Sequence, residues 1–325
     1  MNRRFAIPAL ASLLAALAGV MSTSTHAQAY PSKTVRIIVP YTGGSSDVMA
    51  RAIAPRLQEA FKQTFLVENR PGANAVIGTD LVAKAPPDGY TLLVVLTTHV
   101  ISPSLMQTPF DPLKDFAPVA GISVAELGLA VNNAVPANTL QEFIAHVKSL
   151  PQPLPYAATQ LGGNQHLAGE LFTLITGAKM QVIPYKGGGD AMAALLGGHV
   201  QMYFGSMSSL TPVLKAGKIR GLAVTGNKRH PEFPDMPTFT EAGVPGFEIR
   251  LWYALLAPAG TPREIVNRLS EQVIATVNQP DFRATLAKQG TDPMPLNSEQ
   301  LGAFLRTEHA RYADIIKRAN VKVDP

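Results

Sequence analysis

The sequence predicts an α/β protein of two domains, each a mostly parallel β-sheet flanked by helices. Short β-branched runs alternate with stretches of helical spacing, as in βαβ units. Small polar residues gather where the predicted strands end, which is the ligand-binding edge of an open α/β sheet. The segments 134–139 and 257–262 resemble each other, and each follows an apolar strand and opens a helix. We interpret them as two crossings between domains, which predicts domain 1 over 30–130 plus 255–325 and domain 2 over 131–254.

The first residues predict export from the cytoplasm. Arg3 and Arg4 form a basic start, Phe5–Val20 is apolar, and Ala27-Gln28-Ala29 supplies the small residues of a cleavage site. The apolar run is shorter than a bilayer requires, and no second apolar block follows it. We therefore expect a signal peptide over 1–29, cleaved after Ala29, rather than a membrane anchor.

Composition excludes several classes of protein. The 325 residues contain no cysteine, so disulfides, cysteine-ligated zinc and thiol catalysis are absent. Removal of the segment that holds Arg3 and Arg4 lowers the net charge from +5 to +3. No basic cluster with interleaved aromatic residues occurs, which argues against nucleic acid as a partner. A mild positive charge is compatible with an anionic ligand but does not demonstrate one.

One stretch predicts a site for an anion. Val35–Val39 is an apolar, β-branched run that predicts a buried strand, and a small-residue loop follows it. From Asp47 onward, apolar residues fall four apart, as on one face of a helix. A strand, a glycine loop and a helix N-terminus together present free N–H groups and the positive end of a helix dipole. The alternative is an ordinary turn capped by Ser46 or Asp47. The candidate residues are Tyr41, Gly43, Gly44, Ser45, Ser46 and Asp47.

The remaining elements follow in alternation. The first domain continues with a strand at Phe65–Glu68, a helix at Ala75–Ala85 and a strand at Thr91–Leu96 that ends in Thr97, Thr98 and His99. Further strands are predicted at Leu127–Val131, Tyr156–Ala158, Met180–Pro184, Val200–Phe204 and Gly221–Thr225. A second glycine-bearing loop, Thr159–His166, leads into a helix and repeats the pattern of strand, glycine loop and helix N-terminus. Amphipathic helices at Arg263–Val277 and Ser298–Lys317 return the chain to domain 1.

The sequence has few residues that could catalyse a reaction on a bound ligand. A hydrolase would use Ser45 or Ser46 with His99 or His166, but the chain has no G-x-S-x-G elbow. The seven histidines are scattered singly, without metal-ligand spacing. The glycines at 187–189 lack the spacing of a dinucleotide site. We expect no catalytic residue, no metal and no cofactor.

Several motifs along the chain are typical of one family. They are Tyr30-Pro31-Ser32-Lys33, Gly43-Gly44-x-x-Asp47, Glu68-Asn69-Arg70-Pro71-Gly72-Ala73, Ala83–Leu93 (AKAPPDGYTLL), Asp115-Phe116-Ala117-Pro118-Val119, His166–Phe172 (HLAGELF), Pro184-Tyr185-Lys186-Gly187 and Leu256–Pro262 (LAPAGTP). With these motifs, the chain resembles the Bug family of periplasmic solute-binding proteins, the receptors of tripartite tricarboxylate transporters. The resemblance runs over the whole mature length.

The resemblance implies a periplasmic-binding-protein fold, with two crossover strands as a hinge, that closes on a small carboxylate. Such a ligand is a di- or tricarboxylate, an aromatic acid or an amino acid, held largely by backbone amides and water. We expect a periplasmic monomer, with membrane transporter subunits as possible partners; the alternative is a ligand sensor without a transporter. The ligand-binding residues expected beyond the first loop are Thr97, Thr98, His99, Thr159, Gln160, Gly163, Asn164, Gln165, His166, Tyr185, Gly205 and Ser206.

A few positions keep two interpretations. Many relatives carry Asp-Asn or similar residues where this chain has Gly205 and Ser206, which argues against an amino acid as the ligand unless the position never touches ligand. His99 and His166 either contact the ligand or cap helices and loops. Trp252 and Tyr253 are expected to pack on the hinge side of the core.

Overall fold

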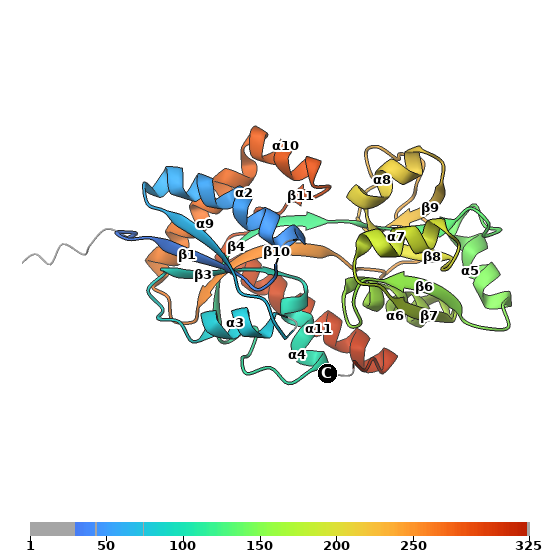
Figure 1. Cartoon of the computed structure of the whole chain (residues 1–325), viewed down its shortest axis with the longest axis horizontal. Coiled ribbons are helices and arrows are strands. Elements are labelled where there is room, and N and C mark those ends of the chain that lie inside the picture. Colours follow the sequence, from blue (N-terminus) through green and yellow to red (C-terminus); the bar gives the residue numbers. More distant parts are fainter. Residues whose placement is uncertain (1–29, 43, 74, 324–325) are drawn as a thin grey trace, which may run out of the picture.

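The computed structural model describes residues 30–42, 44–73 and 75–323. Figure 1 shows two lobes side by side along the long axis, each built on one sheet, with strands passing between them. The predicted signal peptide over 1–29, with its cleavage after Ala29, lies outside the described residues, as does Gly43. In the ranges that are described, no helix combines the length and the apolar character needed to cross a membrane.

The first sheet combines the first four strands of the chain with the last two. Its spatial order is β11 (Asp292–Pro293), β4 (Phe116–Ala125), β10 (Leu251–Pro258), β3 (Thr91–Leu96), β1 (Val35–Val39) and β2 (Phe65–Asn69). One face packs against α2 (Gly44–Phe61), α9 (Arg263–Asn278) and α10 (Pro280–Lys288). The other face packs against α3 (Val76–Ala83), α4 (Thr98–Leu105) and α11 (Ser298–Ala319). Both faces are therefore covered, which explains why strands such as β1 and β3 are apolar throughout.

The second sheet is smaller and built in the same way. Its spatial order is β7 (Met180–Pro184), β6 (Leu154–Ala158), β8 (Met202–Ser206), β5 (Leu127–Asn132) and β9 (Ile219–Val224). One face is covered by α7 (Gly188–Leu196) and α8 (Met207–Lys215). The opposite face is covered by α5 (Leu140–Ser149) and α6 (Asn164–Thr176). Thr139 caps α5, since its hydroxyl accepts the Glu142 N–H at 3.1 Å.

The chain crosses between the sheets twice. Only Glu126 separates β4 from β5, and the segment 225–250 leads from β9 back to β10. The two-domain α/β class is confirmed, but the sheets are mixed rather than mostly parallel. β10 runs antiparallel to β3 and β4, and β5 runs antiparallel to β8 and β9. A strand that enters from the other domain needs no crossover helix, so nothing forces it to run parallel to its neighbours. The interpretation of segments 134–139 and 257–262 as the crossings is wrong, because each joins a strand to the next helix within one domain, β5 to α5 and β10 to α9. The exact domain limits, at 130 and 255, stay a prediction.

Helix α11 connects the two lobes on one side. It packs against α4 and β4 of the first domain and against α6 of the second, and Figure 1 shows it running beneath both. Its start is fixed by a capping box in which Asn297 and Gln300 bond reciprocally. Trp252 and Tyr253, expected as core residues near the hinge, are 0% and 1% exposed. A continuous apolar core, joined through α11, thus extends across the junction of the domains.

Candidate ligand-binding site

The loop after β1 forms the first half of the candidate site. β1 ends at Val39 and α2 begins at Gly44, so the first N–H groups of this long helix have no partner within it. The Asn69 side-chain amide donates to the Tyr41 carbonyl at 2.8 Å and to the Asp47 carboxylate at 2.7 Å. The Arg51 guanidinium also donates to Asp47, which lowers the pKa of that carboxyl. The negative charge of Asp47 is therefore compensated locally and does not repel an approaching anion.

Hydroxyl groups line this half and are held by their own domain. The hydroxyls of Tyr41 and Thr98 hydrogen-bond to each other, and Ser45 hydrogen-bonds to Tyr253. Burial raises the pKa of Tyr41, and burial raises the pKa of Tyr253 to about 12, so both phenols are neutral at physiological pH. Ser46 is only 1% exposed. The first half is thus a surface of neutral hydroxyl groups at a helix N-terminus, held in place by hydrogen bonds within its own domain.

The loop after β6 forms the second half. β6 ends at Ala158, and α6 begins at Asn164 with Gly163 as its N-cap. Gly162 has φ +75° and its amide donates to His166 Nδ1 at 2.8 Å, so the loop turns back on its own helix. Thr159 donates to Gln165 at 3.1 Å, and Gln165 also bonds Tyr203. The chain therefore repeats the strand, loop and helix N-terminus device in the second domain.

The two loops meet at a cleft of about 410 Å³. This is within the usual size of a small-molecule pocket. Its described lining consists of Pro40, Tyr41, Thr42, Ser45, Ser46, Pro71, Gly72, Ala75, Leu96 and Gln160. All of these except Gln160 come from the first domain, and none is charged. An anion in this cleft would be stabilised by helix N-termini and neutral donors instead of by cationic side chains.

The two histidines that sequence reasoning placed in the site are committed to internal contacts. His99 is 7% exposed; its ring stacks on Phe110, and its Nε2 lies 3.0 Å from the Pro112 carbonyl. Burial lowers the pKa of His99 to about 4. The imidazole of His166, 6% exposed, holds the Gly162 amide. Within the described part of the chain, no group of three or more His, Asp or Glu residues is placed to hold a metal ion.

The other expected residues are absent from the described lining of the cleft. Thr97 is fully buried, and its hydroxyl accepts the Trp252 amide at 3.0 Å. Tyr185 donates its amide to the Ala158 carbonyl at 2.8 Å, which places it beside the second loop. Ser206 is the N-cap of α8, and its hydroxyl bonds Ser209. Gly205 packs where an added Cβ would lie 2.8 Å from Leu210 and Tyr203.

Sequence reasoning missed one wall of the cleft. Pro71, Gly72 and Ala75 follow β2, the strand that pairs in parallel with β1. Because parallel neighbours end at the same edge of a sheet, the polar loop after the second strand was the signal that could have identified this wall. Leu96, the last residue of β3, completes the wall.

A larger hollow of about 680 Å³ lies elsewhere, along β9 and the segment 229–242 of the second domain. Most of its charged residues are already paired: Arg229 bonds Glu241, Lys215 bonds Glu232, and Arg220 donates to two backbone carbonyls. None of the described residues of the first domain lines it. The smaller cleft between the domains is therefore the candidate ligand site.

Two α/β domains, a two-strand hinge and a neutral cleft between two helix N-termini define a solute-binding protein. The chain belongs to the tripartite tricarboxylate transporter receptor family, whose profile matches residues 49–321. It is 35% identical over 319 residues to protein BugT of Bordetella pertussis, covering 97% of this chain and 98% of the relative. Receptors of this Bug and tricarboxylate-transporter family are periplasmic solute-binding proteins.

Solved structures of relatives share the fold. Rpa4515 of R. palustris with adipate is 34% identical, has a TM-score of 0.78, and covers 90% of this chain and 99% of its own. MatC of Rhodopseudomonas palustris with bound malate is 31% identical, has a TM-score of 0.73, and covers 88% of this chain and 100% of its own. Both ligands are carboxylates.

Proposed function

We propose that this protein captures a small carboxylate between its two domains and delivers it to a transporter of the tripartite tricarboxylate type. The observation that carries the proposal is the uncharged cleft into which the loops before α2 and α6 both lead. Such a site stabilises a carboxylate through charge-assisted backbone hydrogen bonds. The adipate and malate held by the two relatives support a dicarboxylate as the first ligand to test.

The same proposal includes binding without turnover. A serine hydrolase needs a general base within hydrogen-bond reach of its nucleophile. The Ser45 hydroxyl bonds Tyr253, Ser46 is buried, and His99 and His166 bond backbone groups. Among the hydrogen bonds of the described residues, neither serine meets an imidazole. We further propose a monomer in the periplasm, released by cleavage after Ala29.

A thermal-shift screen of the purified mature protein tests the proposal. Adipate, malate, citrate, benzoate and glutamate are suitable probes, and the bound acid is recovered afterwards and analysed by mass spectrometry. A ligand at a hundred times its dissociation constant stabilises by about 2.7 kcal/mol, which raises the melting temperature measurably. A chemically changed acid would overturn binding without turnover. If no small acid shifts the melting temperature, the receptor assignment fails.

A further inference from the structure

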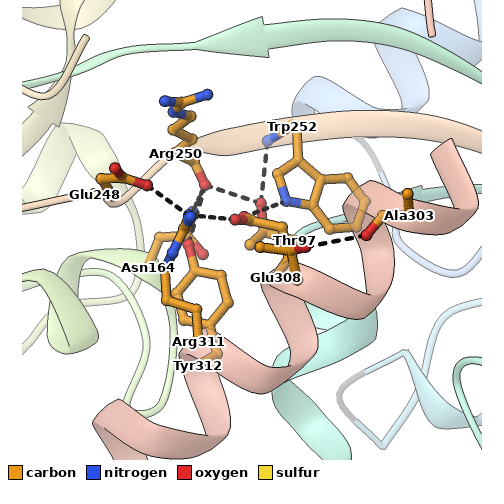
Figure 2. Close-up of polar contacts among 10 residues, drawn as sticks. Thr97, Asn164, Glu248, Arg250, Trp252, Ala303, Glu308, Arg311 and Tyr312 are labelled. Atoms are coloured by element: carbon orange, nitrogen blue, oxygen red, sulfur yellow. Dashed lines mark hydrogen bonds and ion pairs between the residues drawn. The ribbon is translucent and has the colours of Figure 1, made fainter. Parts of the chain in front are cut away.

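One backbone carbonyl at the hinge accepts hydrogen bonds from three parts of the molecule. It belongs to Arg250, the residue before β10, where the chain re-enters the first domain. Figure 2 shows the donors converging on it: Thr97 Oγ1 at 3.2 Å, Asn164 Nδ2 at 2.8 Å and Tyr312 Oη at 3.2 Å. We name this carbonyl and its three donors the hinge hub. A carbonyl oxygen has two lone pairs, so three donors share it and the loss of one leaves it satisfied.

Two of the three donors belong to the halves of the ligand cleft. Asn164 is the first residue of α6, whose N-terminus forms the second half. Thr97 directly precedes α4, and the next residue, Thr98, holds the Tyr41 hydroxyl of the first half. The hinge hub therefore joins both halves of the cleft at one acceptor atom. A displacement of that atom changes the position of both halves together.

The third donor comes from α11, outside the cleft. The Tyr312 ring is completely buried, so its hydroxyl is aimed by packing. On the same helix, Arg311 forms ion pairs with Glu308 and with Glu248, which lies two residues before the hub, at 2.6 Å. Glu308 in turn accepts the Trp252 indole N–H at 3.0 Å. Figure 2 shows Glu308, Arg311 and Tyr312 extending from α11 toward the start of β10, where Glu248 and Trp252 lie.

We propose that Tyr312 is a positioning residue for ligand binding, because its hydroxyl holds the acceptor that joins the two halves of the cleft. This inference rests on the proposed capture of a carboxylate in that cleft. A ligand is bound tightly only when both helix N-termini are in place, so a looser hub makes a smaller fraction of molecules competent to bind. Helix α11 thereby sets affinity without touching the ligand.

The substitution Tyr312→Phe tests this inference with little change in packing. Its matched control is Tyr30→Phe, since Tyr30 is also a buried phenol that donates to a backbone carbonyl, that of Gly89 at 2.7 Å. Titration calorimetry with adipate, or with the acid that the screen identifies, measures affinity. We expect a threefold to tenfold loss for Tyr312→Phe and no loss for Tyr30→Phe. Equal affinities in both variants and the parent would overturn the proposal.

A second readout needs no ligand and separates this inference from the proposed function. Hydrogen exchange of the unliganded protein reports the local stability of the first turn of α6. The Leu167 amide, which donates to the Gly163 carbonyl, closes this turn. We expect faster exchange from Leu167 onward in Tyr312→Phe but not in Tyr30→Phe. A hydroxyl with a merely structural role would lower the melting temperature equally in both variants and leave exchange in α6 unchanged, which would contradict the proposal.

If Tyr312→Phe folds poorly, a variant at the surface tests the same inference. Glu248→Gln removes the ion pair between Arg311 and the segment before the hub, at a side chain that is half exposed. Its control is Glu232→Gln, which removes a comparable surface pair with Lys215 inside the second domain. We expect a twofold to threefold loss of affinity for Glu248→Gln only. Identical affinities for these two variants would count against a role for α11.

Discussion

The two halves of the cleft use the same device but are held in different ways. In the first half, Tyr41 and Ser45 bond Thr98 and Tyr253 of their own domain, and this domain supplies nearly all of the described lining. In the second half, Asn164 is tied to the hinge carbonyl of Arg250, and Gln160 alone lines the cleft. From this difference we propose that the first half is a preformed seat for the ligand. We propose that the second half is positioned by the hinge and closes over the ligand through its differential contacts.

The largest effect is expected from a charge placed in the seat. Ser45 lies in the first turn of α2, where an aspartate is favourable for the helix. In Ser45→Asp, however, the new carboxylate faces the ligand, and two such charges at about 4 Å repel by up to about 4 kcal/mol near a protein surface. We expect a stable protein whose affinity, measured by calorimetry, falls about a hundredfold or more.

The control adds the same charge away from the cleft. Gln141→Glu places a carboxylate in the first turn of α5, on an exposed face of the second domain. It should bind like the parent. If Ser45→Asp also binds like the parent, the seat does not hold the carboxylate.

Acid should weaken the support of the first half, because His99 lies in α4 behind it. Burial lowers the pKa of His99 to about 4, so between pH 6.5 and pH 4 the unfolded chain binds a proton that the folded protein does not. The free energy of unfolding therefore falls as the pH falls through this window, by about 3 kcal/mol at most. Urea denaturation at pH 7.0, 5.5 and 4.5 should show a weaker pH dependence in His99→Gln than in the parent. Parallel curves would exclude His99 as the acid-sensitive group.

A smaller effect is expected from the second half. At Gly163, an added Cβ would lie 3.2 Å from the Gln160 carbonyl, so valine should displace Gln160, the residue through which the second domain lines the cleft. The φ of Gly163, −80°, is open to any residue, and folding should be retained. We expect about a tenfold loss of affinity, or about 1.4 kcal/mol, and less compaction with ligand in solution scattering. Unchanged affinity and compaction would mean that one domain holds the ligand alone.

The smallest effect is expected from Tyr41→Phe, which removes the hydrogen bond to Thr98. A neutral hydrogen bond contributes about 0.5–1.5 kcal/mol, so affinity should fall about twofold to tenfold. In the second half, Thr159→Val removes a comparable bond to Gln165 and serves as the counterpart. We expect the Tyr41 variant to lose more affinity by calorimetry. The reverse order would contradict a preformed seat in the first domain.

Local patterns in the sequence were enough to predict many of the strands and helices. The strands at Val35–Val39 and Thr91–Leu96 were predicted at their observed bounds because each is a short apolar run between turn residues. The helix α4 was not expected, since Thr97, Thr98 and His99 have the polarity of a loop. In the structure they begin a helix, and His99 turns into the core. Composition shows that a residue is polar but does not show which way its side chain points.

Features that depend on contacts between distant segments were harder to predict from the sequence. The antiparallel pairing of β10 with β3 and β4 joins segments more than 120 residues apart, which no local period reveals. The Arg250 carbonyl is a backbone acceptor, and every residue has one, so the hinge hub has no sequence signature. The wall formed by Pro71 and Gly72 was visible as a loop, but its place in the cleft depended on β2 lying beside β1.

Hydrogen exchange with and without the carboxylate that the screen identifies tests the preformed seat most directly, in the parent and in Gly163→Val. We predict that ligand slows exchange over residues 41–47 in both proteins, because the seat exists without the second domain. Over residues 160–167 ligand should slow exchange in the parent only, because closure there depends on an intact loop. Protection of 160–167 in the variant equal to that in the parent, or protection of that segment alone, would contradict the account.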